Sequence, residues 1–241
     1  MKRYRLGCSG WSYSDWIGKF YSDACTPKDM LEEYCRHFDT VELNMSFYRL
    51  PFEQMVKSWA KRTPEGFIFC PKLSRQITHL KKLRNSDELL SAFLGRLGIL
   101  GRKLGPILIQ LPPGLKPNLT ILEKFLETLP GKNRFAIEFR NREWFSPKTR
   151  SLLERYSIAT CLIDSPEMTV DDEVTAPFAY VRWHGSSAWY AHDYSINEID
   201  RWARILADLD VKEVFGYWNN DVDAHAPKNC LSMIRRLKRI G

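Results

Sequence analysis

The chain has 241 residues, of which 44% are hydrophobic and 27% are charged, so it can bury a sizeable core and is not expected to be disordered. No apolar run approaches the roughly 20 residues needed to cross a bilayer, and the first residues lack the apolar core of a signal peptide. We therefore expect a cytoplasmic protein without a membrane partner.

The formal net charge of +7 is unevenly distributed along the chain. Residues 1–120 hold 19 Lys and Arg against 11 Asp and Glu, whereas residues 121–241 hold 17 against 18. Much of the excess lies between Lys72 and Lys103. Such a stretch is either the footprint of a nucleic acid or another polyanion, or the solvated face of a helix.

In chain order, short apolar runs alternate with amphipathic segments from one end to the other. The apolar runs predict eight β-strands, over residues 4–8, 40–43, 67–70, 107–111, 135–139, 159–163, 179–183 and 213–218. Helices are expected from about residue 28, over 53–62, from about 87, over 119–129, 147–156 and 197–209, and at the basic C-terminal end.

Strands and helices that alternate in this way predict an α/β fold with a parallel sheet covered by helices. Eight strands in this length favour closure into a single (β/α)8 TIM barrel over an open sheet, as one domain over residues 1–241. Residues 165–177 contain two prolines and several acids, so the sixth helix is expected to be degenerate.

Each apolar run ends in polar or charged residues. In a parallel barrel all carboxyl ends of the strands lie on one face, where active sites are built, so these residues should converge. Glu42 and Asn44 are two positions apart and point the same way from a strand, as do Glu138 with Arg140. The alternative for the charged residues is a structural ion-pair network that lines the barrel top.

Blocks of residues that are typical of one family run in order along nearly the whole chain. They include Gly7-Cys8-Ser9-Gly10-Trp11, Val41-Glu42-Leu43-Asn44, Gln110-Leu111-Pro112-Pro113, Ala136-Ile137-Glu138-Phe139-Arg140, Val181-Arg182-Trp183-His184-Gly185 and Trp218-Asn219-Asn220-Asp221. In these blocks the chain resembles the domain of unknown function 72 family, whose members look like TIM barrels of unsettled activity. Trp218 and Cys230 depart from the residues usual in that family, and neither is a proposed site residue.

Several kinds of chemistry lack their sequence signature. The chain has no G-x-S-x-G elbow, Walker loop, G-x-G-x-x-G or H-E-x-x-H motif. The six cysteines are scattered without a C-x-x-C pair, which favours buried thiols over a metal cluster or a disulfide set. Metal binding by the strand-end acids is the minor alternative, because the same mouth gathers cations. We therefore expect neither a metal nor a cofactor.

The cations suit an anionic ligand, for which Arg offers a planar fork and Lys a point charge. Glu42 or Glu138 is the candidate general base and His184 the candidate acid. Lys72 is a candidate either for a Schiff base or for simple anion binding, the second being favoured. The candidate substrate-binding residues are Asn44, Tyr48, Gln110, Arg140, Asp164, Arg182, Asn219, Asp221 and Trp11.

Aromatic residues in loops after the strands either stack on a sugar or a base, or plug the top of the barrel; they are Trp11, Tyr13, Phe47, Tyr48 and Trp144. Three functions stay open. The first is a metal-independent enzyme for a small phosphorylated or carboxylated, sugar-like substrate. The second is a nucleic-acid-processing enzyme that uses the basic stretch. The third is a ligand-binding protein without catalysis. The oligomeric state is left open.

Overall fold

The computed structural model describes residues 2–170 and 172–240. Among these residues, eight parallel strands carry the architecture, and each overlaps an expected strand. They are β1 (Arg3–Cys8), β2 (Thr40–Leu43), β3 (Ile68–Pro71), β4 (Ile107–Gln110), β5 (Phe135–Glu138), β6 (Ala159–Asp164), β8 (Phe178–Trp183) and β9 (Glu213–Trp218). Backbone hydrogen bonds join six of them in the order β1-β9-β8-β6-β5-β4 and join β2 to β3 as a separate parallel pair.

The two ladders adjoin on both sides. β3 meets β4 through isolated parallel bridges, one of them between Lys72 and Leu108. Between β1 and β2 the Tyr34 hydroxyl accepts the N–H of Cys8 at 2.7 Å and donates to the carbonyl of Thr40 at 3.0 Å. The expected α/β fold with a parallel sheet is therefore confirmed, whereas the hydrogen-bonded ladder is six-stranded and not a continuous ring of eight.

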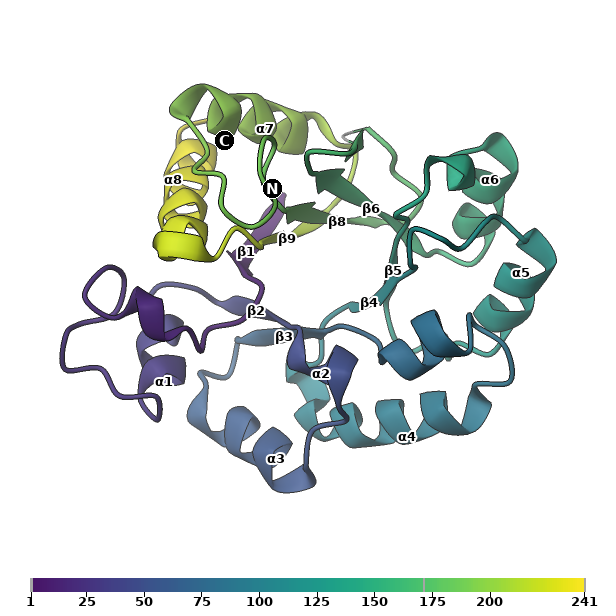
Figure 1. Cartoon of the computed structure of the whole chain (residues 1–241), viewed down its shortest axis with the longest axis horizontal. Coiled ribbons are helices and arrows are strands. Elements are labelled where there is room, and N and C mark those ends of the chain that lie inside the picture. Colours follow the sequence, from purple (N-terminus) through teal and green to yellow (C-terminus); the bar gives the residue numbers. More distant parts are fainter. Residues whose placement is uncertain (1, 171, 241) are drawn as a thin grey trace.

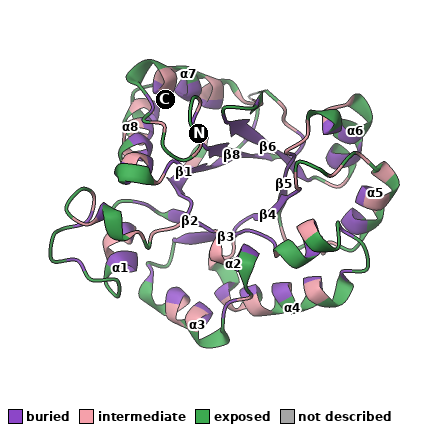
Figure 2. Ribbon diagram, viewed as in Figure 1, coloured by how far each residue is buried: buried purple, intermediate pink, exposed green. Residues whose placement is uncertain are grey.

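The helices lie outside the strands, which surround a common centre (Figure 1). Their strand-facing sides are buried and their outer sides exposed (Figure 2), as amphipathic segments require. The α-helices are α1 (Met30–Cys35), α2 (Met45–Tyr48), α3 (Glu53–Arg62), α4 (Asp87–Leu97), α5 (Leu119–Glu127), α6 (Pro147–Arg155), α7 (Ile196–Asp208) and α8 (His225–Ile240). Shorter helical turns are η1 (Ser14–Trp16), η2 (Gln76–Leu80), η3 (Gly98–Lys103), η4 (Arg142–Trp144) and η5 (Val222–Ala224).

The sixth unit differs from the others, as the sequence indicates. Between β6 and β8 the described residues contain no helix, and the two-residue strand β7 (Thr169–Val170) pairs antiparallel with β6 instead. Two short elements were not expected: α2 follows β2 directly, and the π-helical turn η2 occupies the basic loop after β3. In the part of the chain that the structure describes, no helix is long and apolar enough to span a bilayer.

Side chains that point inward from the strands change character from one end to the other. Because alternate residues of a strand share a face, each strand contributes an inward row with a spacing of two. One such row is Ile68, Cys70 and Lys72, which runs along β3 and one residue beyond it. Another is Phe178, Tyr180, Arg182 and His184, which runs along β8 and one residue beyond it. The apolar members form one buried cluster, and the polar members follow at the carboxyl ends. This gradient places the charged groups at one mouth.

Candidate active site

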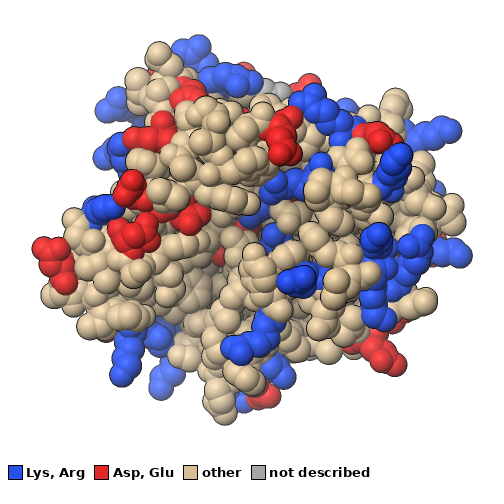
Figure 3. All heavy atoms as spheres, viewed as in Figure 1, with Lys and Arg blue, Asp and Glu red and all other residues tan. Residues whose placement is uncertain are grey.

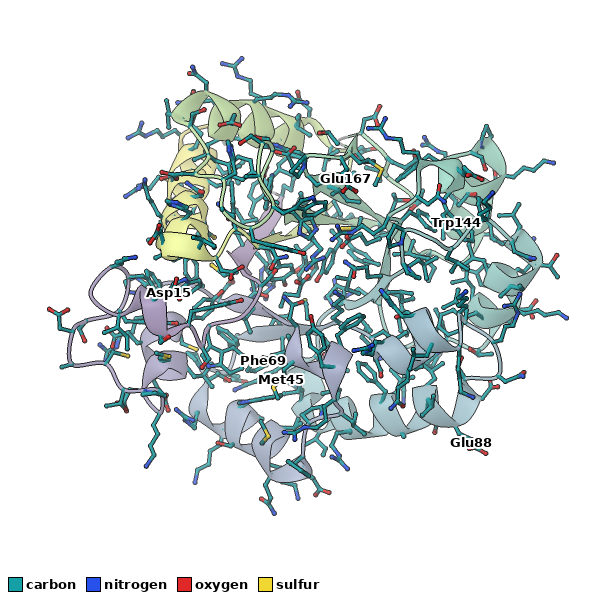
Figure 4. The ribbon with its side chains drawn as sticks, in the orientation of Figure 1. Asp15, Met45, Phe69, Glu88, Trp144 and Glu167 are labelled. Carbon is teal, nitrogen blue, oxygen red and sulfur yellow. The ribbon has the colours of Figure 1, made fainter. Side chains whose placement is uncertain are left out.

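An open cavity of about 580 Å³ lies where the strands end. Its lining is polar and cationic and comes from the ends of β4 and β8 and from the segments that follow β1, β2, β3, β5, β8 and β9. The lining residues are Tyr13, Asn44, Phe47, Tyr48, Lys72, Arg75, His79, Gln110, Arg140, Arg182, Tyr190, Asn219 and Asp221. Figure 3 shows a hollow near the centre of the face viewed, and Figure 4 shows side chains from the strands converging there while Glu88 of α4 points away.

The floor of this cavity is a buried ion-pair network built on Arg182. Its guanidinium is 1% exposed and lies between two carboxylates that are fully buried. Nη2 donates to Oε2 of Glu42 at 2.7 Å, and Nη1 donates to Oε2 of Glu138 at 2.5 Å. One arginine thus links β2, β5 and β8, which matches the alternative of a structural network at the strand ends.

Further donors complete the solvation of both carboxylates. Glu42 also accepts from the hydroxyls of Ser9 at 2.7 Å and Tyr180 at 2.8 Å. Glu138 also accepts from the amide of Gln110 at 2.9 Å and from Nε of Arg140. Burial alone would raise the pKa of the Glu138 carboxyl, but the two guanidinium groups outweigh it and hold that pKa well below its ordinary value.

His184 sits beside this network as a neutral imidazole. Burial, and then the charge of Arg182, lower the pKa of His184 to about 3. Because a guanidinium can only donate, Nε2 accepts from Nη2 of Arg140 at 3.0 Å. Nδ1 lies 2.9 Å from the side-chain amide of Asn219. The ring therefore holds Arg140 and Asn219 in place at the cavity wall.

Lys72 differs from every group in this network. Its side chain follows β3, and the residue is 8% exposed, yet its Nζ forms neither a hydrogen bond nor an ion pair with a described residue. Nζ lies 4.0 Å from the centre of the Phe47 ring, a cation–π distance. Burial, and then the nearby charge of Arg182, lower the pKa of Lys72 to about 7. The mouth thus holds a buried amine that titrates near neutrality.

The rim contains residues that strand-end reasoning missed. Arg75 and His79 come from the η2 segment, and Tyr190 comes from the loop between β8 and α7. Tyr190 adopts a positive φ of 63°, and Gly185 in the same loop has φ of 108°. Burial, and then the charge of Lys72, lower the pKa of His79 to about 4. A cationic loop directly after a strand was the signal that could have identified Arg75.

Most of the sequence-predicted site residues do converge. Eleven belong to the lining or directly support it from the floor, whose members Glu42, Glu138 and His184 are buried beneath the cavity. Those that line it are Asn44, Tyr48, Lys72, Gln110, Arg140, Arg182, Asn219 and Asp221. The side-chain oxygen of Asn44 is buried there without a hydrogen-bond partner among the described residues.

Two predicted site residues lie elsewhere. Asp164 accepts from the indole N–H of Trp202 at 3.0 Å and from the hydroxyl of Thr169 at 3.2 Å, so it joins β6 to α7 and β7. Trp11 packs edge-on against Trp59 and Phe69 instead of lining the cavity. Trp144 is also buried, stacked on Phe139, which is the packing alternative expected for some of the aromatic residues.

No group of three or more His, Cys, Asp and Glu side chains arranged to hold a metal ion occurs among residues 2–170 and 172–240. Glu42 and Glu138, the two carboxylates of the cavity floor, already accept from Arg182, Tyr180, Gln110 and other donors. Their free lone pairs are therefore few, and the donor set does not resemble the oxygen cage of a hard cation.

Comparison with known proteins identifies a family and several relatives of this chain. The family model described as "Protein of unknown function DUF72" matches residues 5–240. The UPF0759 protein YecE of Escherichia coli (strain K12) is 34% identical over 142 residues, covering 58% of this chain and 50% of that protein. The match thus spans about half the length of that relative. The UPF0759 protein YunF of Bacillus subtilis (strain 168) is 28% identical, covering 96% of this chain and 94% of the relative.

Solved structures agree on the fold. A DUF72 family protein from Thermotoga maritima MSB8 matches with a TM-score of 0.87 and 27% sequence identity, covering 98% of this chain and 99% of that chain. A DUF72 family protein from Enterococcus faecalis V583 matches with a TM-score of 0.84 and 24% identity, covering 98% and 95%. These relatives carry family names only, and none of those names states a reaction.

Proposed function

The chain belongs to the DUF72 family, and we propose that it is a (β/α)8 barrel enzyme that acts on a small anionic substrate at the carboxyl ends of its strands. The substrate class is a phosphorylated or carboxylated, sugar-like molecule. The proposed site is the 580 Å³ cavity, whose volume suits such a ligand.

The observation that carries this proposal is the positive charge at the cavity that has no counter-charge. The charges of the floor balance one another, because the two carboxylates of Glu42 and Glu138 face the two guanidinium groups of Arg140 and Arg182. Lys72 and Arg75 then remain at the lining, against the single carboxyl of Asp221. Lys72 is buried and Arg75 is exposed, and cations without a counter-ion favour an anion that brings its own charge.

The surroundings of these side chains change the catalytic and binding roles that the sequence predicted for them. Both terminal nitrogens of Arg182 are occupied by carboxylates, so Lys72, Arg75 and the exposed edge of Arg140 are better suited to touch the ligand. The depressed pKa of Glu138 makes it a weak base, and the depressed pKa of His184 leaves no proton to donate from an imidazolium. We assign Glu42, Glu138 and His184 to positioning, and proton exchange to Lys72.

Ligand binding measured by calorimetry tests this proposal, with inorganic phosphate and pyruvate as probes. Wild-type protein should bind at least one of them, and Arg75→Gln should weaken binding while leaving the melting temperature unchanged. Arg150→Gln on α6, whose guanidinium pairs with Glu154 at the surface, is the matched control. Equal affinities of the wild type and both variants would contradict the proposal. Binding without turnover of any phosphorylated or oxo acid would favour the non-catalytic alternative.

A nucleic-acid-processing enzyme remains the second candidate, and one observation favours it. Lys82, Arg84 and Lys116 line a cavity of about 320 Å³ beside the turn between η2 and α4. Lys82 and Asn85 both have positive φ, of 48° and 46°, and this tight turn leaves the cationic side chains exposed. Figure 3 shows Lys and Arg on the side of α5 and α6. This surface is the proposed phosphate footprint.

A further inference from the structure

We propose that Lys72 is a nucleophile that forms an imine with the carbonyl group of a small oxo acid or oxo phosphate. This inference rests on the proposed function, because the anionic group of the substrate would be held by the cations of the same cavity. It adds a covalent step and narrows the substrate class to aldehydes and ketones that carry a carboxylate or a phosphate.

The backbone of Lys72 is fixed while its amine is free. The backbone N–H donates to the carbonyl of Leu43 at 3.2 Å, and the backbone carbonyl accepts from the hydroxyl of Ser46 at 2.7 Å. The side chain then runs beside Phe47 to the cavity, where Nζ has no hydrogen-bond partner among the described residues. A nucleophile needs this combination of a fixed origin and an accessible lone pair.

The nearest buried carboxylates do not capture the amine, because other donors hold them. Arg182 lies between Glu42 and Glu138 and donates to both, and four further side chains fill their remaining sites. A lysine ion-paired with either glutamate would stay protonated and unreactive. The network therefore keeps the carboxylates from Lys72 and adds a positive field next to it.

Lys103 shows the contrast within the same chain. Its Nζ donates to the carbonyls of Ala60 at 2.6 Å and Thr63 at 2.7 Å, and these acceptors hold the ammonium form in place. Lys72 has no such acceptors and has a pKa near 7, so a substantial fraction of its amine is unprotonated at neutral pH. Burial and neighbouring cations activate a lysine in this way for attack on carbonyl groups.

The proposed step balances as follows. The lone pair of the neutral Nζ attacks the carbonyl carbon, a C–N bond forms, and the carbonyl π pair moves to oxygen, which takes up a proton from water in the open cavity. Nitrogen returns one proton to water, and the carbinolamine forms. A second protonation of the hydroxyl lets it leave as water while the nitrogen lone pair forms C=N. The net change is amine plus carbonyl plus one proton to iminium plus water.

Reductive trapping tests the inference. Full-length protein is incubated at pH 7 with sodium cyanoborohydride and either pyruvate or dihydroxyacetone phosphate, and the adduct is located by peptide mass spectrometry. Lys72 should be modified at least about tenfold faster than the exposed Lys116, because the cavity binds the anionic group of the probe beside an amine whose pKa lies near 7. Acetone, which lacks an anionic group, should give a much smaller preference for Lys72, because only the advantage of the unprotonated amine remains. Modification at equal rates along the surface would overturn the imine.

Two variants separate this inference from the proposed function. Lys72→Met should lose the trapped adduct but keep its fold by circular dichroism, and Arg75→Gln should slow trapping while Lys72 remains. Should Lys72→Met fail to fold, competition settles the question in the wild type, where excess phosphate must slow trapping. Binding of both probes without an adduct at Lys72 overturns the imine and leaves the anion site intact. Neither binding nor an adduct overturns both.

Discussion

Lysine and arginine side chains lie at both ends of the strands, but their surroundings differ between the two ends. At the amino ends, Nζ of Lys2 donates to the carbonyls of Leu206 at 2.9 Å and Ala207 at 2.7 Å, where α7 ends. At the carboxyl ends, Lys72 is more deeply buried and has no acceptor among the described residues. A lysine with acceptors fixes a helix end, whereas a buried lysine without them raises the energy of the folded state.

Two arginines, one from each end, differ in a similar way. Arg134 pairs with Glu213 at 2.7 Å, with side chains 42% and 21% exposed, so water shares the charges. Arg182 pairs with Glu42 and Glu138 where none of the three side chains is more than 1% exposed. The first pair is a surface contact, and the second is a desolvated network whose members depend on one another. Such a network is costly to desolvate, so the loss of one member should matter more at the carboxyl end than the loss of a surface pair at the amino end.

Removing Arg182 should have the largest effect and would sharpen this contrast. Arg182→Met leaves the buried carboxylate of Glu42 without its guanidinium and that of Glu138 with Arg140 alone, and it should lower the free energy of unfolding by about 3–5 kcal/mol, whereas Arg134→Met should cost about 1 kcal/mol or less. Urea denaturation measures both values. The Arg182 deficit should shrink at acid pH, because protonated carboxyls no longer bury charge. Equal losses in the two variants would remove the distinction between the two ends.

Replacing Lys72 should act in the opposite direction. Lys72→Met should raise the free energy of unfolding on the order of a few kcal/mol at neutral pH, since each unit of pKa displacement corresponds to about 1.4 kcal/mol. The folded-state pKa near 7 lies below the ordinary value of 10.5, so the wild type bears the full cost below pH 7 and none above about 10.5. The advantage of the variant should therefore fade between these two limits.

The matched control is Lys2→Met, which loses acceptor contacts at the end of α7 and should destabilise the protein. Denaturation curves at pH 6, 8 and 10 measure both variants. A Lys72→Met variant that is less stable than the wild type throughout this range would show that the amine contributes to folding and would make it equivalent to Lys2.

A smaller change is expected from the rim. Arg75 is exposed at the lining, so Arg75→Gln should cost about 1.5–3 kcal/mol of phosphate or carboxylate affinity through the loss of one charge-assisted contact. Stability should change by less than about 0.5 kcal/mol, as is usual for surface substitutions. Titration calorimetry gives the affinity, and thermal denaturation gives the stability. A change in stability without a change in affinity would place Arg75 outside the binding region.

The basic turn should give the smallest effect on any small ligand. Replacing Lys81, Lys82 and Arg84 with Gln leaves the lining of the 580 Å³ cavity intact, because none of the three belongs to it and all three side chains are exposed in the turn before α4. If this surface binds nucleic acid, the log–log slope of affinity against salt should flatten by roughly 0.7–0.9 per lost contact. An unchanged slope in filter-binding or fluorescence assays would leave the solvated-face interpretation of the basic stretch.

The sequence was sufficient for the strands and for most of the mouth, because a polar residue after an apolar run is visible in one dimension. It was insufficient for Asp164, although the alternation of β6 contains the answer. Cys161 and Ile163 point into the interior, so Asp164, one position further, must point outward toward α7. Glu138 is in phase with the inward residue Ala136 and therefore reaches the cavity floor.

Pairing is the part that no pattern could supply. Nothing in the order of residues shows that Arg182 pairs with both glutamates while Lys72 pairs with neither. That pairing depends on three-dimensional distances between strands. The π-helical turn η2, which brings His79 to the rim, likewise follows from packing and not from hydrophobic periodicity.

The most direct test of the unpaired amine is its own titration. Competitive labelling of the native protein with trace acetic anhydride, followed across pH 5–11 by peptide mass spectrometry, reports the pKa of each lysine. We predict a midpoint near 7 for Lys72, well below the ordinary lysine value of 10.5. A midpoint for Lys72 at or above 10.5 would mean that the amine is paired in solution, and it would contradict the account of this mouth.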